Sequence, residues 1–187
     1  EELRLRVRNT IKSAEVAALT SPSTGLASGR LIEQQLRELM GRPEWGILYI
    51  GIEGLDVFNE VYGFVAGEEV LRFTGMLLND VVDTLGSPED FVGHISGDDF
   101  IVITHQSLVG DLKEEIVERF NANVGTHYDY KSRMQGYVVT QDDEGREVQV
   151  PLMSLRIGTL TVDDGPFTDI REITEAAAES RRRDAVD

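Results

Sequence analysis

The chain has 187 residues, of which 41% are hydrophobic and 28% charged, and its formal net charge is −16. This length suits one domain with a small appendage, and the hydrophobic share is enough for a packed core. The absence of cysteine excludes disulfides and thiolate metal sites. The negative charge argues against nucleic acid as a partner. The sequence contains no run of about 18 apolar residues, so we expect no membrane span in it. Because no secretory signal pattern opens the sequence, we expect a cytoplasmic protein.

Residues 1–20 are predicted to form a linker helix ahead of a domain over residues 21–187. Apolar residues recur there at spacings of four and three, which makes one apolar stripe: Leu3, Val7, Ile11, Ala14 and Ala18. The segment resembles the last helix of a response-regulator receiver domain, which implies an upstream receiver or sensor domain. The alternative is an ordinary N-terminal helix that packs on its own domain, because so short a helix is not stable alone.

The next residues alternate between helix and strand patterns. Apolar spacing predicts helices over 28–40, 65–84, 107–124 and 168–183. The unbroken apolar run over 45–52 is typical of a strand that is covered on both faces. A hairpin is predicted over 136–150 around the acidic turn 142–145, followed by a last strand over 152–161.

Residues 91–103 hold the most informative pattern, because two apolar runs flank Gly97 and Asp98. A Gly-Asp pair between strand-like runs predicts a tight hairpin, since glycine supplies the positive φ that the turn needs. The adjacent carboxylates of Asp98 and Asp99 then lie at the tip, where alternation along the strand lets one face a ligand. The alternative is a surface hairpin with an acidic turn.

Several separated segments resemble the GGDEF family, the diguanylate cyclases. Residues 96–100, Ser-Gly-Asp-Asp-Phe, resemble its Gly-Gly-Asp-Glu-Phe signature, and residues 24–26 and 154–158 resemble its opening segment and its Ser-Ile-Gly strand. A second motif matches without a gap at Asn59, Tyr62, Gly63, Gly67 and Leu71. The resemblance implies an α/β (α+β) fold of the nucleotidyl-cyclase, palm-like type, with a central, mostly antiparallel sheet flanked by helices.

The resemblance also implies a chemistry. Members of the family join two GTP molecules into cyclic di-GMP, one held by each subunit of a homodimer, with metal ions that offset the phosphate charge. It therefore implies a guanine nucleotide, a homodimer, and Mg²⁺ or Mn²⁺ when nucleotide binds. The residues so implied are Asp98 and Asp99 as catalytic acids, Asn59, Glu68, Gly97 and Ser96 as nucleotide contacts, and Asp98 with the backbone carbonyl of Ile52 as metal ligands.

The implied metal site is incomplete. The acid that the family carries at the end of the first strand is replaced by Gly51, which offers no carboxylate. Glu53, two residues on and on the same strand face, is a possible substitute. Asp99 is one methylene shorter than the usual Glu, and Ser96 replaces a glycine, which narrows the room for phosphate and restricts φ.

Two further family features are weakened. The product-inhibition motif Arg-x-x-Asp reads Ser87-Pro88-Glu89-Asp90, so Asp90 is a remnant without the arginine that would bind the ligand. The basic residues that grip phosphates in active members have no clean match. Arg181, Arg182 and Arg183 are expected to stabilise the end of the last helix.

Loss of a metal carboxylate should reduce the rate by orders of magnitude. The sequence therefore predicts a degenerate GGDEF output domain in bacterial cyclic di-GMP signalling, which binds a guanine nucleotide with weak or no cyclase activity. One alternative is an active diguanylate cyclase that makes cyclic di-GMP from two GTP as a homodimer and routes its metal through Glu53, Asp98 and Asp99. Another is a protein-interaction domain without a ligand.

Overall fold

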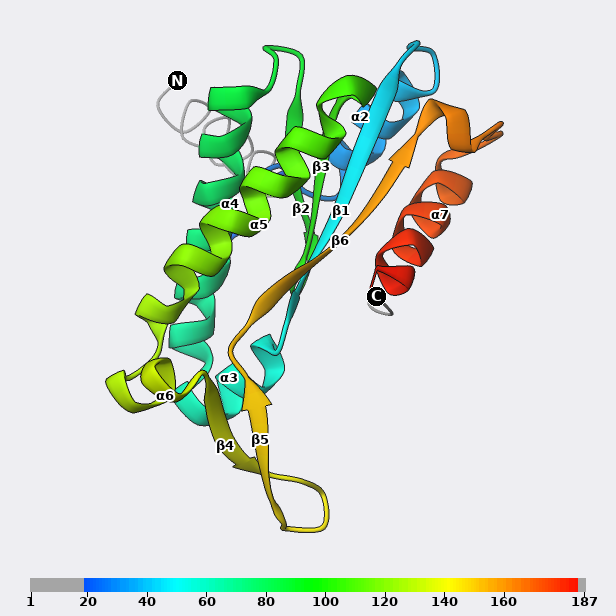
Figure 1. Cartoon of the computed structure of the whole chain (residues 1–187). Helices are drawn as coiled ribbons and strands as arrows, with labels where there is room; N and C mark the ends of the chain where they lie inside the picture. Colours follow the sequence, from blue (N-terminus) through cyan, green and yellow to red (C-terminus); the bar gives the residue numbers. More distant parts are fainter. Residues whose placement is uncertain (1–18, 185–187) are drawn as a thin grey trace, which may run out of the picture.

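The computed structural model describes residues 19–184, so the predicted linker helix lies almost entirely outside the described residues. Four strands form one antiparallel sheet in the order β2-β3-β1-β6. Their bounds are Trp45–Glu53 (β1), Phe91–Ser96 (β2), Asp99–His105 (β3) and Ser154–Thr161 (β6). A separate hairpin of β4 (Tyr137–Gln141) and β5 (Glu147–Pro151) projects from the sheet (Figure 1).

Helices cover both faces of this sheet (Figure 1). The long helices α4 (Phe64–Leu85) and α5 (Val109–Val124) pack on one face, and α2 (Arg30–Leu39) and α7 (Ile170–Arg183) pack on the other. The short helices α3 (Leu55–Tyr62) and α6 (Tyr130–Gln135) lie at the end of the sheet that carries the β4–β5 hairpin. Among residues 19–184, no helix combines the length and apolar composition that a bilayer crossing requires.

Strand β1 divides the core into two layers. Its even-numbered Leu48, Ile50 and Ile52 join the cluster under α4 and α5, whereas Ile47 and Tyr49 join the cluster under α2 and α7. Each fully buried aliphatic side chain of this kind stabilises the fold by about 1.5–3 kcal/mol. The alternation also decides that position 51 faces α7, because successive side chains along a strand point to opposite faces.

The predicted α/β fold is confirmed, and so are the predicted strands, hairpins and helices within the described residues, with ends that differ by one to several positions. Two helices were not predicted. Helix α3 is only eight residues long and lies between Gly54, whose φ is 81°, and Gly63, whose φ is 89°. Helix α6 has six residues, begins after the Asp129 cap and ends at Gly136. Neither is long enough to show a clear helical period.

Candidate functional site

The tip of the signature hairpin lies against the end of β1. Gly97 and Asp98 form the turn between β2 and β3, and the φ of Gly97 is 53°. The backbone N–H of Ile52 donates to the carbonyl oxygen of Asp98 at 3.2 Å. Asp99 pairs directly with Gly51 across the two strands. The structure therefore brings together Asp98, Asp99 and Ile52, and it places Gly51, the position at which the family resemblance implies a carboxylate, beside them.

An arginine from the far end of the chain completes this cluster. The Arg181 guanidinium, from the last turn of α7, is ion-paired through Nη1 with Oδ1 of Asp99 and lies 5.1 Å from the ring centre of Tyr49. The Tyr49 hydroxyl donates to Oδ2 of Asp99 at 3.2 Å. Burial, followed by the nearby Asp99 carboxylate, raises the pKa of Tyr49 to about 12. Both oxygens of Asp99 thus have partners within the protein.

Sequence reasoning missed this role of Arg181, because the two residues of the pair are 82 positions apart. Its neighbours behave as the sequence predicts for surface arginines at a helix end. Arg182 and Arg183 pair with Glu179 on the same helix, and their side chains are 71% and 78% exposed, against 23% for Arg181.

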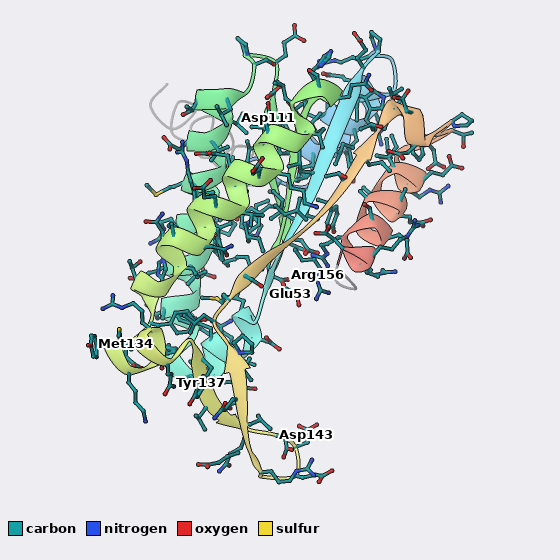
Figure 2. The ribbon with its side chains drawn as sticks, viewed as in Figure 1. Glu53, Asp111, Met134, Tyr137, Asp143 and Arg156 are labelled. Carbon is teal, nitrogen blue, oxygen red and sulfur yellow. The ribbon has the colours of Figure 1, made fainter. Side chains whose placement is uncertain are left out.

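The residues present do not fit a divalent metal ion. A Cβ atom built on Gly51 would point into the Arg181 guanidinium and towards Oδ1 of Asp99, so a cationic group already fills the space beside that carboxylate. Glu53, the predicted substitute, is ion-paired with Arg156 at 2.9 Å, and Figure 2 shows the two side by side. In the part of the chain that the structure describes, no group of three or more His, Cys, Asp or Glu side chains could hold a metal ion.

The predicted base-binding residues lie on the two helices that meet at Gly63. Asn59 is on α3, and Gly67 and Glu68 are on α4. Oδ1 of Asn59 is buried without a hydrogen-bond partner, and a Cβ on Gly67 would overlap it. Glu68, the next residue, is exposed. The arrangement places an unpaired amide oxygen near an accessible carboxylate, and both groups accept hydrogen bonds.

Ser96 is tolerated without backbone strain. It is the last residue of β2, is exposed, and follows a register shift between His94 and Ser96. Among the described non-glycine residues only Glu44 has a positive φ. The glycine that the family carries at this position is therefore not required here for its φ angle.

His94 was not predicted to contribute to the site, yet its side chain contacts the backbone of the hairpin turn. Its Nε2 lies 2.9 Å from the carbonyl oxygen of Gly97, and its Nδ1 lies 2.7 Å from the hydroxyl of Ser21. The imidazole also stacks on Phe100, with ring centres 4.5 Å apart. The signal in the sequence is the Gly-His-Ile that precedes the signature.

Asp90, which the sequence analysis predicts to be a remnant of an inhibitory site, makes its hydrogen bonds to nearby residues. Its carboxylate accepts hydrogen bonds from the backbone N–H and hydroxyl of Ser87, at 3.0 and 2.7 Å, and from the hydroxyl of Thr104 at 2.9 Å. These three hydrogen bonds give Asp90 a structural role at the start of β2.

Comparison with known families and structures agrees with this fold. The family model described as "Diguanylate cyclase, GGDEF domain" matches residues 18–150. The coiled coil and GGDEF domain of DgcB from Caulobacter crescentus, solved in complex with c-di-GMP, superposes with a TM-score of 0.69 at 17% identity, covering 97% of this chain and 87% of that one. Comparison with curated protein sequences gives no significant match.

Two structures from Pseudomonas aeruginosa are similar in fold. The diguanylate cyclase SiaD in complex with its activator SiaC gives a TM-score of 0.66 at 14% identity, covering 98% of this chain and 64% of that one. The FimX GGDEF domain gives 0.64 at 12% identity, covering 89% and 93%. At these identities the likeness establishes the fold alone.

Proposed function

Because this chain belongs to the GGDEF family of diguanylate cyclase domains, we propose that it is a degenerate output domain which binds a guanine nucleotide and makes cyclic di-GMP slowly or not at all. Domains of this family act in c-di-GMP signalling and generally use a divalent metal ion.

The observation that carries the binding half of the proposal is the unpaired, buried Oδ1 of Asn59 beside the exposed Glu68. Buried polar atoms in folded proteins nearly always have a partner, and an exception calls for a ligand or water. Guanine carries N–H donors on one edge, which suit a carboxylate and an amide oxygen. Oδ1 itself is buried against Gly67, so binding at this place would require the Asn59 amide to turn towards the guanine edge, where it would gain the partner that the protein itself does not supply.

The reduced activity follows from the other half of the site. Catalysis of phosphoryl transfer depends on charges that are aligned before the reaction, and each such group is worth about a hundredfold or more in rate. Here Gly51 supplies no carboxylate and Asp99 is bonded to Arg181 and Tyr49. Asp98 remains exposed at the turn. These features support weak or absent turnover.

The proposal also includes a homodimer, an upstream receiver or sensor domain, residues 1–20 as linker and residues 21–187 as the domain. The sequence also predicts Mg²⁺ or Mn²⁺ when nucleotide binds, whereas the Arg181 guanidinium beside Asp99 leaves the residues at this end of the hairpin a poor fit for a metal ion. Thermal unfolding with GTP, in buffer that contains either metal or a chelator, decides between the two.

The experiment is to incubate the purified chain with GTP, GDP or ATP and to measure both thermal stabilisation and cyclic di-GMP. A nucleotide at 100 times its Kd stabilises the folded state by about 2.7 kcal/mol, which raises the Tm by roughly 5–10 °C. We expect stabilisation by the guanine nucleotides and little or no product. Rapid product formation would instead support the active cyclase, and no stabilisation by any nucleotide would support the interaction domain.

A matched pair of variants assigns the effect to the site. Glu68→Gln should abolish most of the stabilisation by GTP, because it removes the charged acceptor. Glu69→Gln makes the same charge change at the adjacent exposed position and should leave the stabilisation unchanged.

A further inference from the structure

Three strands place a row of residues under the last turn of α7. Asp99 of β3, Gly51 of β1 and Arg156 of β6 are paired in register, and directly paired residues point to the same face of a sheet. That face is the one that α7 covers. The only position in the row without a side chain is Gly51, and the Arg181 guanidinium lies over it.

The fold holds Arg181 at this point through the backbone of α7. A Cβ on Gly158 of β6 would collide with the backbone nitrogen of Arg181 and the carbonyl oxygen of Ala177, so helix and strand are in direct contact there. The Ser180 hydroxyl bonds to both the N–H and the C=O of Thr159, at 3.1 and 2.9 Å. The Cα of Arg181 is thereby fixed, and its side chain reaches Asp99 without help from a mobile loop.

The contacts of the guanidinium are those of a bound cation. Nη1 pairs with one oxygen of Asp99, and the π face of Tyr49 lies 5.1 Å from Cζ, within the range of a cation–π interaction. Tyr49 also donates to the second Asp99 oxygen, which requires its protonated form. The Arg181 side chain is only 23% exposed and that of Asp99 21%, so bulk solvent does not fully screen the pair.

We propose that Arg181 is a built-in cation which replaces the divalent metal and excludes it from the Asp98–Asp99 end of the hairpin. A metal ion there would need oxygen ligands, yet Asp99 is ion-paired with Arg181, Gly51 has no side-chain oxygen, and the positive charge of Arg181 lies where a side chain of residue 51 would be. One consequence rests on the proposed function: a guanine nucleotide would bind equally well with and without Mg²⁺.

The test follows Mn²⁺ binding residue by residue, in the absence of nucleotide. The chain carries 34 acidic residues and will bind Mn²⁺ weakly at many places, so paramagnetic broadening of the Asp98 and Asp99 amide signals in an isotope-labelled protein is the measurement. In the wild type we expect these signals to broaden no earlier than those of exposed acids such as Asp143. Early, selective broadening of the Asp98 and Asp99 signals in the wild type would overturn the proposal. This part of the test uses the wild-type protein alone.

Two double variants test whether Mn²⁺ binds at this place once Arg181 is removed and an acid is placed at position 51. In the double variant Gly51→Asp with Arg181→Ala, the amide signals of Asp98 and Asp99 should broaden selectively, at a Mn²⁺ concentration on the order of tenfold lower than in the wild type. Changes of this size in metal affinity are produced by altering the residues around a metal site. Gly51→Asp with Arg182→Ala has the same net charge but keeps Arg181, and should resemble the wild type. If the two double variants bind Mn²⁺ alike, the proposal is wrong. Because no nucleotide is present, this result is independent of whether GTP binds.

Discussion

The Nε2 atom of His94 lies 2.9 Å from the carbonyl oxygen of Gly97, the residue that begins the signature turn. A carbonyl oxygen only accepts, so Nε2 donates this bond, while Nδ1 lies 2.7 Å from the hydroxyl of Ser21. The backbone N–H of His94 also donates to Ala27 at 2.8 Å. One side chain thus connects the segment that enters the domain to the turn that carries Asp98.

This arrangement predicts that His94→Phe, which can still stack on Phe100, destabilises the protein by about 1–3 kcal/mol, because a buried hydroxyl and a carbonyl lose their partner. Urea unfolding measures the change. His105→Phe is the matched control, since that side chain is 45% exposed and its change should stay within about 0.5 kcal/mol. Equal losses in the two variants would show that the His94 bonds do not stabilise the hairpin.

Gly67→Ala should weaken guanine-nucleotide binding about fivefold or more while the domain remains folded. The new Cβ overlaps Oδ1 of Asn59 and forces the amide out of its position, and a misplaced hydrogen-bonding group costs about 1–3 kcal/mol. Calorimetric titration with GTP gives the affinity. Gly110→Ala in α5, where a Cβ meets nothing within 4 Å, is the control and should bind as the wild type does. Unchanged affinity for GTP in the Gly67 variant would show that Asn59 does not contribute to binding of the guanine base.

Gly158→Ala should displace α7. The added methyl meets backbone atoms of the helix rather than the end of a flexible side chain, and such overpacking costs about 1–3 kcal/mol. Hydrogen exchange should show faster opening of α7 than in the wild type, with the long helix α4 unaffected. Gly41→Ala, whose Cβ would make only an ordinary contact with Glu38, should change neither stability nor exchange. A fully protected α7 in the Gly158 variant would contradict the close contact.

His127 should make stability depend on pH near neutrality. Burial, partly opposed by Glu69, lowers the pKa of its imidazole in the folded protein, so the unfolded chain takes up the proton first. The contribution is fully present above the unfolded pKa of about 6.5 and is lost as pH falls through it towards the folded value. Between about pH 8 and about pH 5, the free energy of unfolding should therefore fall more for the wild type than for His127→Gln. Parallel falls measured by urea unfolding would count against this assignment.

The sequence by itself predicted the family and the main elements of the fold. Long apolar periods and the Gly97-Asp98 turn are local signals, and they predicted β1, α4, α5 and the signature hairpin. The resemblance to the family marked Gly51 as a position where an acid is expected and none is present. The short helices α3 and α6 were not predicted, because they have too few residues to show a helical spacing of apolar side chains.

Only the tertiary structure decided what fills the vacant position. The ion pair of Arg181 with Asp99 joins residues 82 positions apart, and the pairing of Glu53 with Arg156 depends on the register of β1 and β6. No local pattern encodes either contact, because each requires the sheet to form and α7 to pack upon it. The physical reason is range: periodicity reports on neighbours within a few turns, whereas charge pairing at a site depends on distances that exist only after folding.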